Sequence, residues 1–231
     1  WTAIWAIAST FLNYVVGLGL ALLTNKKGIK LKGMWRTIYI LPYAMPAFIS
    51  LLVFRLMFNG IGPINNMLVN FGIERIPFFT DPILAKISVL AINTWVGAPY
   101  FMVLLSGSLT NISSTLYEAA EIDGATKMQQ FKHITLPMLL FQTAPVLILS
   151  FAYNFNNFGA IYLLTDGNPV NSNLKFAGET DILVTWLYKL TVNQQQFGMA
   201  AVISIVLFAF IATVSLYNFR KSKSFTEEDM I

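Results

Sequence analysis

Long apolar segments alternate with short polar intervals along the whole chain. Each apolar segment has about 20 residues or more, the length that an α-helix needs to cross a hydrocarbon core of about 30 Å. The pattern predicts an all-α polytopic membrane protein, with one transmembrane domain over residues 1–219 and a tail over residues 220–231. Pro42 and Pro46 predict a kink in the second span. The predicted spans are about 1–24, 37–58, 83–105, 137–164 and 197–219.

Composition supports a membrane protein and excludes several kinds of chemistry. Of the 231 residues, 56% are hydrophobic and 11% are charged, whereas a soluble domain has about 25% charged residues. The chain has no cysteine, which excludes disulfides, thiol catalysis and cysteine metal sites. Its only histidine is His133, which disfavours a histidine-based metal site. The net charge of +4 is modest, and the basic residues gather at segment ends, a pattern typical of membrane orientation rather than nucleic-acid binding.

The basic residues predict which polar intervals face the cytoplasm. Loops rich in Lys and Arg stay inside, so we expect loops 25–36 and 106–136 and the tail to be cytoplasmic and the first residue to lie outside. Because the chain begins at Trp1 inside an apolar run, we expect a piece of a longer protein with a further span upstream. Ten of the fifteen basic residues fall on the predicted inner side: Lys26, Lys27, Lys30, Lys32, Arg36, Lys127, Lys132, Arg220, Lys221 and Lys223.

The spans give no sign of an energy source of their own. They carry no Asp, Glu or His near their centres, where ion-driven carriers usually hold such a group. The sequence also lacks a phosphate-binding loop of the G-x-x-x-x-G-K-[ST] kind. If the chain transports a solute, we therefore expect the energy to come from elsewhere and any ATP to be handled by another chain. The alternative is a purely structural bundle.

Neutral polar residues form two faces at helical spacing. Such groups are costly in lipid and should face the bundle interior or an aqueous path. Amides and hydroxyls beside aromatic rings suit a neutral polyhydroxylated ligand. The alternative, left open by spacing alone, is that the asparagines hold helices together and Gly97 permits close packing. The faces are Asn93, Val96, Gly97 and Tyr100 on the third span, and Ser150, Tyr153, Asn154 and Asn157 on the fourth.

The longest polar interval on the predicted inner side is EAAEIDGATKMQQFKHITLP, residues 118–137. Its first residues are good helix formers, Gly124 can break a helix, and Pro137 is placed to open the next helix. The interval predicts a helix, a glycine joint and a second helix lying across a membrane face. A structure of this kind is better suited to docking to a partner than to catalysis.

This interval resembles the signature loop of the membrane-spanning permeases of binding-protein-dependent ABC importers. The signature is E-A-A-x-x-x-G, nine residues, then I-x-L-P, and the spacing is complete. Further stretches resemble maltose/maltodextrin permeases of the larger, MalF type: 41–50, 93–100, 150–158, 163–169 and 177–190. The signature and its flanking positions are Glu118, Ala119, Ala120, Asp123, Gly124, Ala125, Ile134, Leu136 and Pro137.

The resemblance implies a type I ABC importer (MetI-like) core with five transmembrane helices in this chain. It implies a bacterial inner-membrane location, and as partners a second homologous permease, two ATP-binding subunits and an extracellular sugar-binding protein. ATP and Mg would be bound by the partner ATPase, with no cofactor and no catalytic residue in this chain. The signature residues would form a coupling helix seated in the ATPase, with Glu118 paired to a basic residue there.

The resemblance also implies a maltodextrin-type sugar site on the two polar faces. Tyr153 stands where the family has phenylalanine, and Val96 stands where it has leucine. The implied sugar contacts are the eight residues of those faces: Asn93, Val96, Gly97, Tyr100, Ser150, Tyr153, Asn154 and Asn157. The alternatives are the same machinery for another neutral solute, such as another sugar or a polyol, and an ion-driven carrier or channel.

Overall fold

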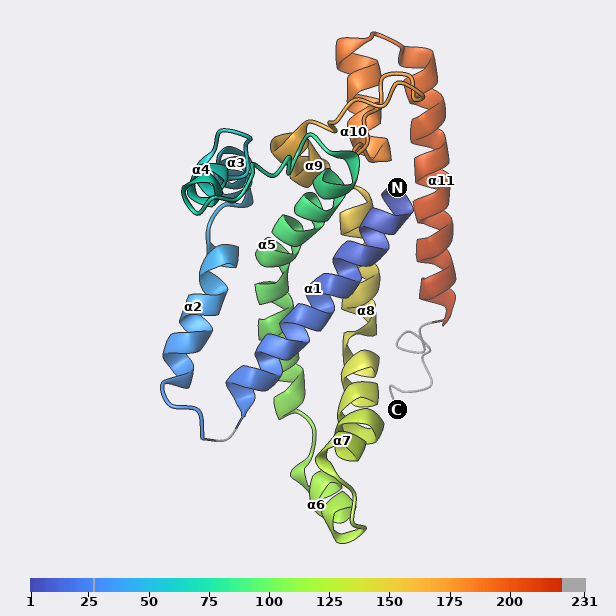
Figure 1. The fold of residues 1–231 in the computed structure, drawn as a ribbon. Helices are drawn as coiled ribbons and strands as arrows, with labels where there is room; N and C mark the ends of the chain where they lie inside the picture. Colours follow the sequence, from blue (N-terminus) through green and yellow to red (C-terminus); the bar gives the residue numbers. More distant parts are fainter. Residues whose placement is uncertain (27, 222–231) are drawn as a thin grey trace.

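The computed structural model describes residues 1–26 and 28–221, so most of the predicted tail lies outside the described residues (Figure 1). Within that part, the chain is mostly helical and contains no β-strand. The elements are α1 (Thr2–Asn25), α2 (Lys32–Ala44), α3 (Ala47–Met57), α4 (Pro63–Asn70), α5 (Pro82–Thr110), α6 (Ser114–Ile122), α7 (Lys127–Gln130), the π-helical turn η1 (Phe131–Thr135), α8 (Leu136–Phe155), α9 (Phe158–Thr165), α10 (Leu183–Tyr188), the π-helical turn η2 (Lys189–Asn193) and α11 (Phe197–Lys221).

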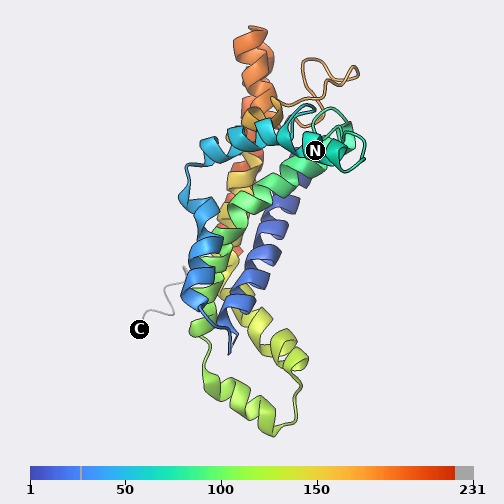
Figure 2. The ribbon, with the colours of Figure 1, turned by 60° about the vertical axis from the view of Figure 1, so that its left-hand side comes forward.

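The centre of the molecule is the packing of α1 against α5 and α8 (Figures 1 and 2). The face of α1 that is buried carries small and polar residues at helical spacing, so the backbones approach closely. At Gly17 the approach is close: a Cβ there would lie 2.5 Å from the Cβ of Phe101 and 2.8 Å from the carbonyl oxygen of Ala98. This close contact fixes the position of α1 along α5.

The second predicted span is not a single kinked helix. Instead, α2 and α3 meet at an angle of 87° (Figure 2). Met45 is extended (φ −79°, ψ 141°), because a residue that precedes proline is disfavoured in the helical region. Pro46 then caps α3 and has no N–H to donate to α2. Pro42, by contrast, lies inside α2.

The fourth predicted span is also divided. Helix α8 ends at Phe155, and α9 begins at Phe158. The Asn157 side chain accepts a hydrogen bond from the Ala160 N–H at 3.2 Å, which caps a new helix. The prediction that Asn157 shares one helical face with Ser150 and Asn154 is therefore wrong.

By length and apolar composition, three described helices can cross a membrane: α1, α5 and the continuous stretch Lys127–Phe155. The bent pair α2–α3 would make a fourth, and Phe197–Thr213 in α11 is a shorter apolar helix. The turn between α1 and α2 lies at the same end of the molecule as α6 and α7, and α4, α9 and α10 lie at the opposite end (Figure 1). The two loops that the basic residues predict to be cytoplasmic are thus at one end.

Candidate functional site

Three of the predicted path residues meet in the core. The Asn93 amide of α5 donates to the Asn154 side-chain oxygen at 3.3 Å, and the Asn157 amide donates to the Asn93 side-chain oxygen at 3.4 Å. Asn154 is 1% exposed and Asn93 is 7% exposed. The structure therefore brings these asparagines together and removes two of them from the surface.

Helix α1 completes this asparagine cluster, a contact that helical spacing alone did not predict. The Asn154 amide also donates to Thr10 Oγ1 at 3.3 Å and to the Ser150 carbonyl oxygen at 2.9 Å. Trp5 Nε1 donates to the Asn154 carbonyl oxygen at 3.0 Å. The amide of Asn154 is thus used to hold α1 and α5 to α8. The sequence feature that could have indicated this contact is the group of polar residues Ser9, Thr10 and Asn13 in an apolar span.

Gly97 lies against α1. A Cβ at this position would lie 2.5 Å from Asn13 Nδ2 and 2.8 Å from Asn13 Cγ. Asn13 itself is 5% exposed, and its side-chain oxygen has no hydrogen-bond partner among the described residues. The missing side chain at Gly97 makes room for this buried amide.

The predicted aromatic contacts lie elsewhere. Tyr153 is 67% exposed, although its neighbour Asn154 is buried. Tyr100 is exposed too, with its ring centroid 5.8 Å from that of Tyr43 on α2. Val96 and Ser150 are half-buried. Of the eight residues, the three asparagines form a largely buried cluster, Val96, Gly97 and Ser150 are half-buried, and the two tyrosines are exposed.

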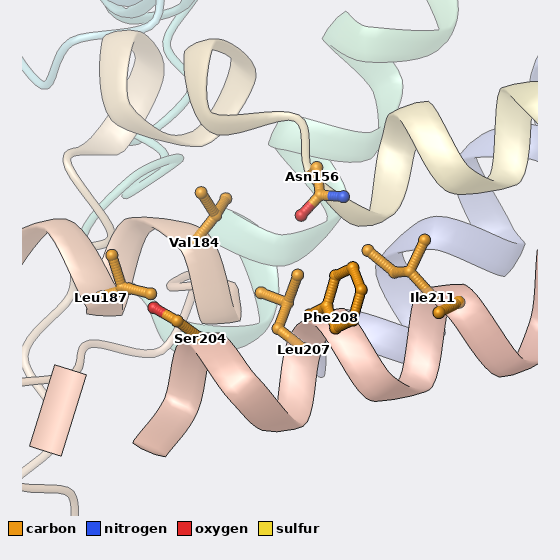
Figure 3. Close-up of a pocket in the computed structure, with 8 residues that line it drawn as sticks. Asn156, Val184, Leu187, Ser204, Leu207, Phe208 and Ile211 are labelled. Atoms are coloured by element: carbon orange, nitrogen blue, oxygen red, sulfur yellow. The ribbon is translucent and has the colours of Figure 1, made fainter. Parts of the chain in front are cut away.

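A pocket of about 390 Å³ opens where α8 ends, between α10 and α11 (Figure 3). Its walls are apolar, apart from Asn156 and Ser204, and Ser204 Oγ donates to the Ala200 carbonyl oxygen. None of the eight predicted path residues lines it. No group of three acidic, histidine or cysteine side chains in the described part of the chain is arranged to hold a metal ion. The lining is Asn156, Val184, Leu187, Ser204, Leu207, Phe208, Ile211 and Ala212.

The interval 118–137 begins as predicted, with a helix and a glycine joint. Gly124 has φ +75°, a left-handed conformation that glycine adopts at little cost. The Ala125 N–H donates to the Ala120 carbonyl oxygen at 2.8 Å, and the Gly124 N–H donates to the Glu121 carbonyl oxygen at 3.1 Å. These two bonds form a Schellman motif, which satisfies the last carbonyls of α6.

The second half of this interval forms the predicted second helix, but this helix continues into the next span. Helix α7 begins at Lys127, capped by Thr126 and Gln129, and it continues through η1 into α8. Pro137 therefore lies within a continuous helical stretch and does not start it. Because Pro137 has no N–H, the preceding turn widens into the π-helical turn η1.

The interval is anchored on one side and exposed on the other. The hydroxyls of Tyr117 and Thr135 lie 2.8 Å apart, and Ile134 and Leu136 pack on the buried apolar cluster formed by α1, α5 and α8. Glu118, Ala119, Asp123 and Pro137 are exposed, and Ala120 and Ala125 are half-buried. Two large apolar side chains, Ile122 (87% exposed) and Met128 (73%), also stand out at the tip. The signature residues thus form two groups. Ile134 and Leu136 anchor the loop to the core, and Glu118 and its neighbours face outward.

Comparison with known proteins places this geometry in a family. The family model described as "Binding-protein-dependent transport system inner membrane component" matches residues 13–223. The galactooligosaccharides transport system permease protein GanP of Bacillus subtilis (strain 168) is 41% identical over 230 residues, covering 99% of this chain and 55% of that protein. The maltodextrin transport system permease protein MdxF of the same organism is 42% identical over 240 residues, covering 100% and 55%. The chain thus spans about half the length of these curated relatives.

Among solved structures, the chain is similar to a crystal structure of a bacterial alginate ABC transporter in complex with an alginate pentasaccharide-bound periplasmic protein. The two share 25% sequence identity with a TM-score of 0.78, over 98% of this chain and 77% of that one. The arrangement of α1, α5, α8 and the loop between α5 and α8 is therefore shared with a chain of that transporter.

Proposed function

Because the chain belongs to the family of binding-protein-dependent transport system inner membrane components, we propose that it is a permease subunit of an ATP-driven sugar importer. It would move maltodextrin-type oligosaccharides inward by alternating access. The observation that carries the proposal is the match over 99–100% of the chain to permeases named for oligosaccharide and maltodextrin transport. Because GanP is named for the transport of galactooligosaccharides, another neutral sugar is the nearest alternative substrate.

The proposed coupling element is the exposed side of α6 and the Gly124 joint. Its partner would be an ATP-binding subunit, one of two, which binds ATP and Mg so that this chain needs no cofactor. A force on α6 would reach the span α8 through the Tyr117–Thr135 contact and the packing of Ile134 and Leu136. Because the Schellman motif and the cap at Thr126 hold both sides of the joint, the loop can move as a unit.

The proposed sugar path includes the eight predicted residues, and five of them have one of two distinct roles. Tyr100 and Tyr153 are exposed, so their rings and hydroxyls can contact a sugar directly. The asparagine cluster would hold the helices that carry these tyrosines in register. A second, homologous permease would supply the opposite wall of the path.

The remaining partners are proposed from the family. The similar alginate transporter forms a complex with a periplasmic protein that is bound to a pentasaccharide, and an external sugar-binding protein is proposed to deliver sugar to this chain too. The proposed location is the bacterial inner membrane, where the apolar helices α1, α5 and α8 would span the bilayer.

Glu118→Lys in the assembled transporter tests the coupling role. Glu118 is exposed and makes no ion pair among the described residues, so a charge reversal should leave folding and insertion intact. We expect sugar uptake and sugar-stimulated ATP hydrolysis to be lost. The matched control is Glu74→Lys, the same reversal at an exposed position between α4 and α5, at the opposite end of the molecule. Normal transport by Glu118→Lys would refute the coupling role.

The substrate is tested separately. Purified native transporter is assayed for ATP hydrolysis with maltodextrins, galactooligosaccharides and a polyol, each with the external binding protein. Stimulation by maltodextrins supports the proposed sugar, and stimulation by the polyol alone would overturn it. Uptake that continues after ATP depletion would favour an ion-driven carrier or channel.

A further inference from the structure

Two acids on the loop between α9 and α10 reach lysines on two different elements. Glu179 Oε2 lies 2.5 Å from Lys86 Nζ, in the first turns of α5. Asp181 Oδ2 lies 2.8 Å from Lys189 Nζ, the first residue of η2. Residues 179–181 therefore form a strap that ties α5 on one side to the turn that leads into α11 on the other.

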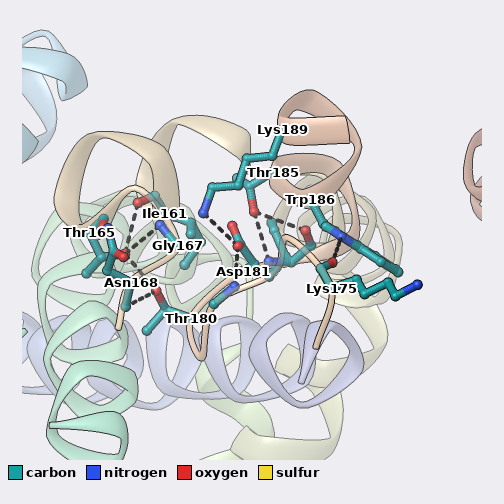
Figure 4. A network of polar contacts seen from close by, with 12 residues as sticks. Ile161, Thr165, Gly167, Asn168, Lys175, Thr180, Asp181, Thr185, Trp186 and Lys189 are labelled. Carbon is teal, nitrogen blue, oxygen red and sulfur yellow. Dashed lines mark hydrogen bonds and ion pairs between the residues drawn. The ribbon is translucent and has the colours of Figure 1, made fainter. Parts of the chain in front are cut away.

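On the α10–α11 side, the strap is held by a network of polar contacts (Figure 4). The Asp181 side chain is 1% exposed, and its Oδ2 also accepts a hydrogen bond from the Gly178 N–H at 2.7 Å. A Cβ at Gly167 would lie 1.9 Å from Asp181 Oδ1, so only glycine fits there. Thr180 Oγ1 lies 2.7 Å from both the Asn168 carbonyl oxygen and Thr165 Oγ1.

The α5 side of the strap is partly open to solvent. The Lys86 and Glu179 side chains are 30% and 21% exposed. Lys86 Nζ also lies 5.6 Å from the Trp1 ring centroid, and Asn171 Nδ2 donates to Glu179 Oε1 at 2.7 Å. Trp1 Nε1 donates to the Thr180 carbonyl oxygen at 3.0 Å. The strap thus contacts the outer ends of both α1 and α5.

Helix α11 has few other attachments to the bundle. It stands beside the other helices in Figure 1, and it meets α8 through the stacked rings of Phe155 and Phe210, 4.9 Å apart. Its start follows η2, whose first residue, Lys189, is held by Asp181. The pocket of Figure 3 fills the gap between α11, α10 and the end of α8.

We propose that Glu179 and Asp181 are positioning residues that fix α11 relative to α5, and so set the width of this pocket beside the proposed path. The Asp181–Lys189 pair is the permanent attachment, because it is buried and Gly167 and Gly178 fit closely around it. The Lys86–Glu179 pair is the adjustable one, because water reaches it. Its rupture would let η2 and α11 swing away from α5.

The first test measures the distance between α5 and α11. The chain has no cysteine, so single cysteines for spin labels can be placed at Ile83 on α5 and Val202 on α11, which are 69% and 61% exposed. In the assembled, labelled transporter, Glu179→Lys and Lys86→Glu should each broaden the distance distribution and shift it to longer values. The double variant, with the charges exchanged, should restore a narrow distribution.

The control is Lys175→Glu, on the same loop, because Lys175 is exposed and forms no ion pair among the described residues. It should leave the distance unchanged. An unchanged distance in both single variants, or a double variant that stays broad, would overturn the proposal. Since the Lys86–Glu179 pair is partly exposed, these variants are expected to fold even if Asp181→Asn does not.

The second readout is transport, which rests on the proposed function. Each single variant should lower sugar uptake by about fivefold, which corresponds to the loss of about 1 kcal/mol, the upper end for one partly exposed ion pair. The double variant should recover to within about twofold of native uptake. A loss that the double variant does not recover would argue against the positioning role. If the distances respond as expected but the native protein takes up no sugar, the proposed function fails while the strap stands.

Discussion

Gly17→Ala tests the contact that fixes α1 on α5. The added Cβ would meet the Phe101 Cβ at 2.5 Å and the Ala98 carbonyl oxygen at 2.8 Å, and neither atom is the tip of a flexible side chain. Ordinary carbon contacts lie at about 3.5–4.0 Å, so α1 must move away from α5 by roughly 1 Å. Overpacking of this kind costs about 2–3 kcal/mol. Alanine in place of glycine in a helix returns about 1 kcal/mol, which leaves a net loss of about 1–2 kcal/mol.

Gly19→Ala is the matched control, because a Cβ at Gly19 would meet nothing within 4 Å. The helix-propensity gain is the same at both positions, so the difference between the two variants isolates the overpacking cost. Free energies of unfolding of the purified protein in detergent, from denaturant titration, should place Gly17→Ala below native and Gly19→Ala at or above it. Equal stability of the two variants would refute the reasoning.

Gly97→Ala extends the comparison to the proposed path. The three atoms nearest to its new Cβ all belong to the Asn13 side chain, which can rotate, so the loss of stability should be smaller than for Gly17→Ala. If Gly97 lies on the sugar path, uptake should fall more than stability does. Equal effects of Gly97→Ala and Gly17→Ala on both measurements would contradict this distinction.

Two further predictions concern the Gly124 joint and the asparagine cluster. Gly124→Ala forces an L-residue into the left-handed region at about 1–2 kcal/mol, so amide hydrogen exchange in α6 should quicken by about 5–30-fold, whereas Gly107→Ala, which meets nothing within 4 Å, should not change it. Asn154→Ala leaves its hydrogen-bond partners unpaired and should lower the free energy of unfolding by about 1–3 kcal/mol. Tyr153→Ala, at a position 67% exposed, should leave thermal melting in detergent unchanged and reduce sugar uptake. A lower melting temperature with unchanged uptake would contradict the proposed contact of Tyr153 with the sugar.

The sequence by itself determined the helical class, the positions of the long apolar segments, and the helix and glycine joint at the start of the interval 118–137. These features depend on local information: runs of about 20 apolar residues, the left-handed conformation that Gly124 permits, and a signature whose spacing is complete. It also selected the positions Asn93, Asn154 and Asn157, because amides in apolar helices must find a polar partner.

What those amides contact was decided only by the tertiary structure. Helical spacing places residues on a face but does not say which helix covers that face, so the contacts of Thr10 and Trp5 with Asn154 were not visible. The 87° bend after Met45 and the break at Asn157 also changed the expected spans. The ion pairs of Glu179 and Asp181 join residues 93 and 8 positions apart, and only the folded chain brings the more distant of these pairs together.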